Sequence, residues 1–225
     1  PRIAVIVSGL GLSAAATEAA IKLLPGAVTL AFDPYAPGLE AWVVMARRSG
    51  HEILLSLPLE PADFPIHDPG PYALLTNQEP EENLRRLEFL LGRLAGYVGL
   101  ATVMGSKFSA SDENMRPVLM TLKKRGLLFV DGGAGAGKLG PKIATEISLP
   151  WALSNMVLDA VPSKSAIDGQ LAKLEALVRE HAAVLAIGSP NPSTLGRLAA
   201  WIPTLEAKKL VLVPVSAIAD KQFIE

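Results

Sequence analysis

Residues 3–11 read Ile-Ala-Val-Ile-Val-Ser-Gly-Leu-Gly, a run of five apolar residues followed by a serine and a glycine-rich turn. An apolar run of this length, without polar alternation, is typical of a strand that is buried on both faces. Similar runs recur along the chain, most of them about 25–30 residues apart. They occupy residues 3–7, 28–32, 53–57, 97–103, 127–130, 156–158, 184–187 and 210–215.

Segments with helical periodicity follow most of these runs. Apolar side chains share one helical face in residues 84–94, after the capping-box-like Thr76-Asn77-Gln78-Glu79, and again in residues 167–178. Residues 58–75 form a long irregular stretch with five prolines, which predicts a stiff, ordered loop. Strand–helix alternation of this kind predicts an α/β fold, either a doubly wound open sheet or a closed (β/α) barrel.

Length and composition set the class of protein. The 225 residues fit a single domain, residues 1–225, and a hydrophobic content of 50% excludes a disordered chain. A net charge of −1 with no basic stripe predicts no nucleic-acid partner, and the apolar runs are too short for a membrane span. The chain begins at Pro1 rather than Met, so we expect a mature or shortened form, in which a removed targeting segment would leave no trace.

Both candidate architectures place function at the C-terminal ends of the strands. Small hydroxyls and carboxylates dominate the residues expected there, which are Ser8, Asp33, Ser56, Thr102, Asp131, Asp159, Ser189 and Ser216. The three histidines lie elsewhere: His51 opens a strand, His181 ends a helix, and His67 is in the proline-rich loop. Because a transition-metal site needs such ligands to converge, we interpret them as structural or surface residues. His67 is the exception, since it could form a polar cluster with Asp63 and Asp68.

Two glycine motifs suggest nucleotide binding. Gly9-Leu10-Gly11-Leu12-Ser13-Ala14 matches G-x-G-x-x-A after a strand, and Asp33 ends the next strand near where a ribose-binding acid belongs. The alternative is a glycine-rich turn that simply starts a helix. Residues 132–139 resemble a phosphate loop, but the Ser or Thr that would hold magnesium is replaced by Leu139. Dinucleotide binding is therefore a lesser hypothesis, and nucleotide hydrolysis a weaker one.

Several segments in order resemble the divergent polysaccharide deacetylase family. Among them are Ser56-Leu57-Pro58-Leu59-Glu60-Pro61 and Val103-Met104-Gly105-Ser106. The full set covers residues 3–11, 28–32, 50–61, 68–71, 74–76, 103–108, 115–119, 125–131, 187–190 and 213–217. The resemblance implies an irregular (β/α) barrel with about seven parallel strands and a cleft for polymeric carbohydrate at the strand ends. It also implies a divalent metal such as zinc and a periplasmic or exported location.

The departures from the family pattern concern the metal site. Where the family's metal-dependent members have Asp-Asp-Leu-Gly, this chain has Ser8-Gly9-Leu10-Gly11, and Ser56 replaces a histidine. Their Asn-His-Met becomes Thr102-Val103-Met104, and their Gly-His-Pro becomes Gly188-Ser189-Pro190. Hydroxyl groups are poor zinc ligands and carry no charge to offset the cation. We therefore expect no metal and no cofactor, and very slow amide hydrolysis by the family's route.

These observations favour a catalytically impaired member of the family that binds a glycan, such as a cell-envelope polysaccharide, or a protein partner. The residues that we expect to line its cleft are Ser8, Ser56, Glu60, Thr102, Ser106, Lys107, Asp131 and Ser189. The main alternative is an active carbohydrate deacetylase or esterase with a rebuilt site that uses His67, Asp63, Asp131 or Glu60. A serine hydrolase would need His67 or Lys107 as its base. Trp151 could stack on a sugar ring, but a core position is favoured.

Overall fold

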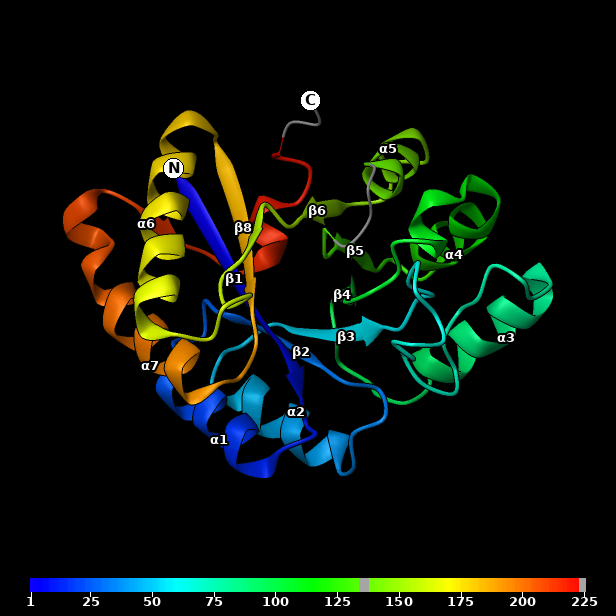
Figure 1. Ribbon diagram of the computed structural model, residues 1–225, viewed down its shortest axis with the longest axis horizontal. Coiled ribbons are helices and arrows are strands. Elements are labelled where there is room, and N and C mark those ends of the chain that lie inside the picture. Colours follow the sequence, from blue (N-terminus) through cyan, green and yellow to red (C-terminus); the bar gives the residue numbers. More distant parts are fainter. Residues whose placement is uncertain (134–137, 223–225) are drawn as a thin grey trace.

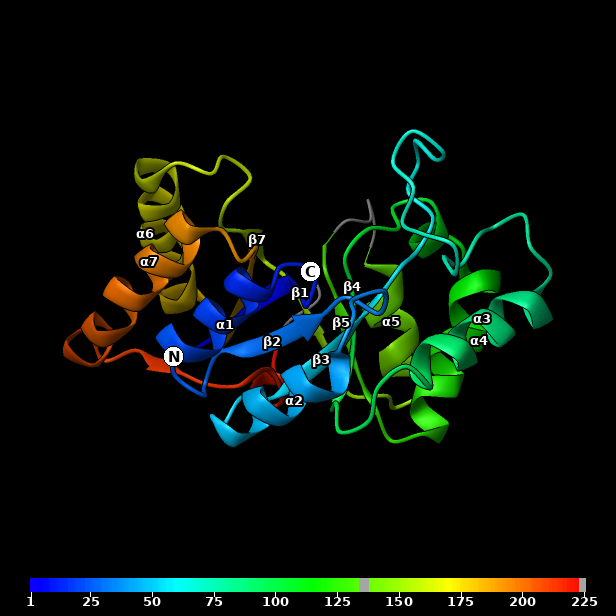
Figure 2. The ribbon, with the colours of Figure 1, turned by 90° about the horizontal axis from the view of Figure 1, so that it is seen from below.

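The computed structural model describes residues 1–133 and 138–222, which form one curved parallel sheet with helices packed around its outside (Figures 1 and 2). The strands are β1 Arg2–Leu10, β2 Thr29–Phe32, β3 Ile53–Leu57, β4 Gly99–Thr102, β5 Leu128–Asp131, β6 Trp151–Leu153, β7 Met156–Val157, β8 Ala183–Gly188 and β9 Val211–Leu212. The α-helices are α1 Ala14–Leu23, α2 Leu39–Arg48, α3 Pro80–Leu91, α4 Asp112–Lys124, α5 Leu139–Glu146, α6 Lys164–Glu180 and α7 Pro192–Trp201. Four short 3₁₀ helices complete the described part: η1 Phe108–Ala110, η2 Ile202–Thr204, η3 Glu206–Lys208 and η4 Val215–Ile218.

The sheet closes into an irregular barrel through one bent strand. The strand order is β6-β5-β4-β3-β2-β1-β8-β7, and β9 pairs with the start of β1. The two edge strands β6 and β7 are separated in the chain only by Ser154 and Asn155. Ser154 N–H donates to Asp131 O and Asn155 N–H to Leu185 O, both at 2.8 Å, so residues 151–157 bridge β5 and β8. Counted as one bent strand, they bring the main strands to seven and confirm the predicted barrel.

The barrel interior is apolar and one end is plugged. Ala4, Ile6, Leu54 and Leu185 belong to an inner cluster, while a larger cluster lies between the sheet and the helices. The η4 segment joins the inner cluster through buried Val215 and Ile218. It lies at the N-terminal end of the strands, since β9 just before it pairs with the beginning of β1. The C-terminal strand ends therefore form the open mouth of the barrel.

The predicted helical faces and the favoured core position of Trp151 are confirmed, and one local expectation needs adjustment. Helix α6 buries Ile167, Leu171, Leu174 and Val178 as its pattern indicates. Helix α3 begins at Pro80 with Glu79 at its N-cap position and no side-chain cap, so Thr76 lies before the cap, and its hydroxyl donates to Glu60 instead. Trp151 opens β6 and is buried in the core. No helix within the described residues is long and apolar enough to cross a membrane.

Candidate functional site

Two adjacent cavities lie at the open mouth of the barrel. The first, which we call the Ser8 cavity, has a volume of about 250 Å³. It is lined by Ile6, Ser8, Ala101, Thr102, Val103, Gly132, Val157, Asp159, Ile187, Gly188 and Ser189. The second, the Ser56 cavity, has about 200 Å³. It is lined by Gly9, Asp33, Pro34, Tyr35, Ser56, Pro58, Asp68, Pro69, Val103 and Met104. Together they reach the roughly 300–1,000 Å³ that is typical of small-ligand sites, with exposed Val103 between them.

Strand register brings Ser8 and Ser189 to the same cavity. Val7 of β1 pairs with Gly188 of β8, so the next residues of both strands reach the mouth side by side. A single oxygen of the Asp159 carboxylate, Oδ2, fixes the side chains beside Ser189. It accepts hydrogen bonds from Ser189 N (2.9 Å), Ser189 Oγ (2.5 Å), Thr194 Oγ1 (2.7 Å) and Asn191 Nδ2 (3.3 Å). The Ser189 hydroxyl also accepts from Asn191 (2.9 Å), and its proton is committed to Asp159.

Thr102 anchors the opposite wall of the Ser8 cavity. Its Oγ1 accepts a hydrogen bond of 2.8 Å from the N–H of Gly132. A side chain at position 132 would place Cβ 1.9 Å from Thr102 O, so only glycine allows the two strands to approach this closely. Asp131 is buried directly before that glycine and lines neither cavity. Burial raises the pKa of Asp131, and the hydrogen bond from Gly133 N–H (2.9 Å) opposes the shift.

The Ser56 cavity combines two carboxylates with apolar walls. Asp33 follows β2 and accepts a hydrogen bond from Tyr35 N–H (2.8 Å), while burial raises the pKa of its carboxyl. Asp68 reaches the cavity from the proline-rich loop, residues 58–75, which projects from the molecule in Figure 2. Ser56 is buried, and its Oγ is the one fully buried side-chain oxygen or nitrogen without a hydrogen-bond partner in the part of the chain that is described.

Glu60, Ser106 and Lys107 line neither cavity; they hold the proline-rich loop instead. Glu60 is buried and accepts hydrogen bonds from Lys107 Nζ (2.7 Å) and from the Thr76 N–H (2.6 Å) and hydroxyl (2.7 Å). Burial alone would raise the pKa of Glu60, but these hydrogen bonds outweigh it and the pKa is lowered. Ser106 Oγ accepts from Ala62 N–H at 2.9 Å. These side chains shape the mouth through the loop.

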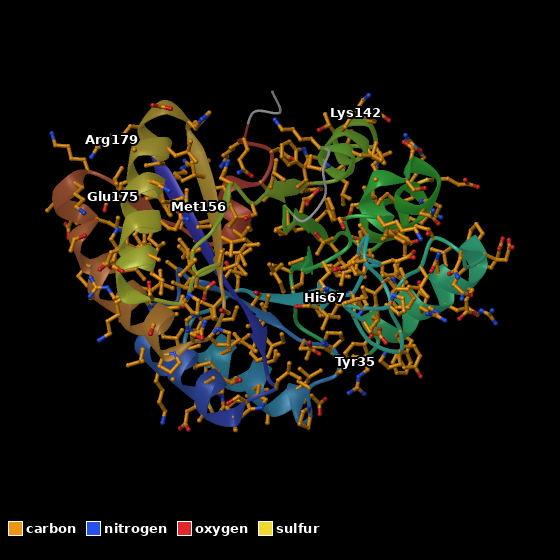
Figure 3. All side chains as sticks on the ribbon, viewed as in Figure 1. Tyr35, His67, Lys142, Met156, Glu175 and Arg179 are labelled. Carbon is orange, nitrogen blue, oxygen red and sulfur yellow. The ribbon has the colours of Figure 1, made fainter. Side chains whose placement is uncertain are left out.

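The histidines do not converge. His51 is buried just before the start of β3, with Nδ1 2.7 Å from Val28 O, which confirms its structural role. His67 Nδ1 lies 2.5 Å from Asp63 Oδ2 in the exposed loop, and His181 caps the end of α6. Figure 3 shows His67 and Tyr35 at the side of the barrel where this loop lies. No histidine hydrogen-bonds a cleft serine among the described residues, and Lys107 Nζ donates to Glu60, so neither proposed base of the serine-hydrolase alternative contacts a serine nucleophile.

The residues of the Ser8 cavity do not fit the divalent metal that the family resemblance implies. The described residues contain no group of three or more His, Cys, Asp or Glu side chains that could hold a metal ion. The Ser8 cavity offers hydroxyls and one carboxylate, Asp159, whose Oδ2 already accepts four hydrogen bonds. Zinc prefers nitrogen, sulfur or carboxylate ligands, so this donor set is unsuitable.

The glycine motifs have local roles. Gly11 N–H donates to Thr17 Oγ1 at 2.8 Å, and Ser13 caps helix α1, so these groups are engaged within the turn. Gly9 lies within β1 and lines the Ser56 cavity. Residues 134–137 of the phosphate-loop-like stretch lie outside the described residues.

Several cavity residues were not anticipated from the sequence. Tyr35, Met104 and Val157 line the cavities, and each follows or belongs to a strand. Tyr35 stands two residues after Asp33, which the strand-end argument does identify, so extending that argument by two residues would have found it. Met104 and Val157 are apolar but exposed at the mouth. An apolar residue in the sequence does not show whether it will line a cavity or pack in the core.

Comparison with known proteins gives consistent matches over the whole chain. The family model described as "Divergent polysaccharide deacetylase" matches residues 5–219. Uncharacterized protein YibQ of Escherichia coli K12 is 23% identical over 208 residues, which are 92% of this chain and 64% of YibQ. The chain therefore spans slightly less than two thirds of that curated relative.

Solved structures are similar to the fold. An uncharacterized protein from Agrobacterium tumefaciens C58, ATU2773, superimposes with a TM-score of 0.93 and 34% identity, over 96% of this chain and 88% of that chain. The catalytic domain of a peptidoglycan N-acetylglucosamine deacetylase from Eubacterium rectale matches with a TM-score of 0.60 and 12% identity, over 100% of this chain and 92% of that chain. At this identity the second match shows the barrel alone.

Proposed function

This chain belongs to the divergent polysaccharide deacetylase family, and from that premise we propose that it binds a glycan at the mouth of its barrel without hydrolysing it. The observation that carries the proposal is the composition of the Ser8 cavity. Ser8, Thr102 and Ser189 meet there beside one carboxylate, Asp159, whose Oδ2 already accepts four hydrogen bonds. In this reaction class a metal makes the water nucleophile and polarises the amide carbonyl, and neutral hydroxyls do neither well.

The remaining features of the mouth suit binding. Hydroxyls, three carboxylates and backbone groups stand among apolar side chains, and ligand sites commonly combine apolar walls with a few polar groups. The braced loop over the Ser56 cavity makes one wall rigid before a ligand arrives, which reduces the entropic cost of binding. The E. rectale fold neighbour is named for an activity on peptidoglycan. We therefore propose a cell-envelope polysaccharide as the ligand, and a periplasmic or exported location for the protein.

The test measures binding and turnover on the same ligand. We expect N-acetylglucosamine or glucosamine oligosaccharides, or peptidoglycan fragments, to bind in isothermal titration calorimetry. We expect no acetate release above buffer from the acetylated ligands, with or without added zinc. Val103→Arg places a long cation between the two cavities and should weaken binding at least tenfold. The control Val211→Arg changes another exposed valine, on β9 at the other end of the barrel, and should leave binding unchanged.

Two results would overturn the proposal. Acetate release that depends on Asp131, Glu60 or His67 would favour the rebuilt deacetylase or esterase instead. Absence of binding to every glycan, or binding that Val103→Arg does not affect, would remove the mouth of the barrel as the site.

A further inference from the structure

The Ser56 cavity carries two carboxylates and no cationic side chain in its lining. We propose that this cavity binds the free ammonium group of a deacetylated amino sugar, such as a glucosamine unit. The protein would then recognise the product of deacetylation in preference to the acetylated polymer. This inference rests on the proposed function, because it assumes that a glycan occupies the mouth of the barrel.

The carboxylates of Asp33 and Asp68 are each oriented by a backbone N–H that donates to one of their two oxygens. Asp33 Oδ1 accepts from Tyr35 N–H, and Asp68 Oδ1 accepts from Gly70 N–H, both at 2.8 Å. No described residue donates to the second oxygen of either carboxylate. Gly70 packs against the Tyr35 ring, where a Cβ would lie 2.4 Å from a ring carbon, so the two segments that carry the acids are held together. The Tyr35 hydroxyl adds a hydrogen bond from Tyr72 N–H (3.1 Å).

Nearby cations are committed elsewhere. Arg86 pairs with Glu82 (2.9 Å) and donates to Ala73 O (2.7 Å), and Arg93 donates to Pro34 O (3.1 Å). Lys107 is paired with Glu60. The negative charge of Asp33 and Asp68 is therefore not neutralised by a protein ion pair. An ammonium group supplies three donors and one positive charge, which makes charge-assisted hydrogen bonds to such oxygens.

Ser56 provides an independent indication of a ligand. Only 6% of the residue is exposed, it lines this cavity, and its hydroxyl oxygen has no hydrogen-bond partner among the described residues. A buried polar group without a partner costs free energy, and a ligand hydroxyl or amine toward which the Ser56 side chain turns would remove that cost. Pro34, Pro69 and Met104 give the apolar walls against which the C–H faces of a sugar ring can pack. Burial raises the pKa of Asp33, and a bound cation would favour its ionised form.

The experiment compares a glucosamine tetramer with an N-acetylglucosamine tetramer, at a pH where the amine is protonated. We expect the intact chain to bind the glucosamine tetramer at least tenfold more tightly. Asp33→Asn and Asp68→Asn keep the side-chain shape but remove the charge, and each should reduce that preference several-fold. Asp63→Asn removes a carboxylate of the same loop that pairs with His67 outside the cavity lining, and should preserve the preference.

A second measurement does not depend on the variants. In the unmodified protein, the glucosamine tetramer should shift the backbone amide resonances of Tyr35 and Gly70, whose N–H groups contact the two carboxylates. Equal affinity for both tetramers, or a preference that neither Asn variant reduces, would overturn the inference and leave the proposed function intact. Failure of both tetramers and of peptidoglycan fragments to bind would overturn the proposed function as well.

Discussion

Asp131 is a single carboxylate that the fold holds away from water at the end of β5, and its pKa is raised by that burial. Its folded-state pKa lies above its unfolded value, which is about 3.9 for Asp. The folded state therefore binds the proton more tightly than the unfolded chain does. As pH rises from about 4 through the raised pKa, Asp131 loses its proton and progressively destabilises the fold.

Asp131→Asn should therefore raise the free energy of unfolding at pH 7, and the gain should shrink as the pH falls toward about 4. The Asn side-chain oxygen can still accept the hydrogen bond from Gly133 N–H, so the geometry is kept. Urea denaturation of both proteins at several pH values between 4 and 7 measures the difference. A difference that is constant over this range, or that grows as the pH falls, would contradict the prediction.

At the residue scale, the strand-end argument succeeded where backbone pairing decides position. Ser8 lies near the end of β1, Thr102 ends β4 and Ser189 directly follows β8, and all three share one cavity. Ser56, within β3, lines the adjoining cavity. It did not place Glu60, Ser106 and Lys107, because their positions depend on how an irregular loop folds back. Asp131 ends a strand as expected but is covered, and sequence position alone does not reveal burial.

At the element scale, the proline-rich loop owes its shape to one buried acid. The Glu60 carboxylate accepts hydrogen bonds from Lys107, in the segment after β4, and from Thr76, just after the end of the loop. Glu60 therefore ties the two segments together. Its backbone oxygen also accepts from the N–H groups of Lys107 and Phe108. The prolines limit the conformations that the loop can adopt, and the hydrogen bonds of Glu60 stabilise one of these conformations.

Glu60→Gln should destabilise the protein by about 1–3 kcal/mol, because a charge-assisted hydrogen bond is lost within a buried site. The loop should also become more sensitive to limited proteolysis within residues 58–75. The control Glu79→Gln alters an exposed glutamate beside the same loop, which makes no side-chain cap to α3. Equal stability and equal cleavage rates for the two variants would show that Glu60 is not the brace.

At the scale of the whole molecule, barrel closure depends on the bend between β6 and β7. Asn155 donates its N–H to Leu185 O and accepts from Leu185 N–H through Oδ1, both at 2.8 Å. Gln222 Nε2 also donates to Asn155 Oδ1 (2.9 Å), which ties the C-terminal segment to the bend. The Asn155 side chain thus supplies the acceptor that a backbone carbonyl would supply in a regular strand, at the point where the bent strand stops pairing with β5 and begins pairing with β8.

Asn155→Ala should reduce the free energy of unfolding by about 1–3 kcal/mol, because Leu185 N–H loses its acceptor inside the barrel wall. The exchange of that amide proton should accelerate more than the exchange of other β8 amides. Ser154→Ala, at the same bend, removes only a hydroxyl bonded to Met156 O at 3.2 Å and should cost under about 0.5 kcal/mol. Unchanged exchange at Leu185 in Asn155→Ala would exclude this role.

The sequence could predict the barrel but not how it closes. Apolar runs located β1, β2, β3, β4, β5 and β8 because each is long enough to form a continuous apolar pattern. The bent strand was only half recognised, at residues 156–158. Its two parts have three and two residues, and Ser154 and Asn155 interrupt the apolar pattern between them. Closure is a property of the folded sheet, since the two parts pair with strands distant in the chain.

The central claim is that this barrel mouth has no ligand set for a catalytic metal. The most direct measurement is the zinc content of the whole chain after equilibration with zinc and dialysis, followed by thermal melting with increasing zinc. We predict far less than one zinc per chain and no rise in melting temperature, because a metal that bound the folded state would stabilise it. One zinc per chain that is lost in Asp159→Asn, together with a rise in melting temperature in the unaltered protein, would contradict the claim.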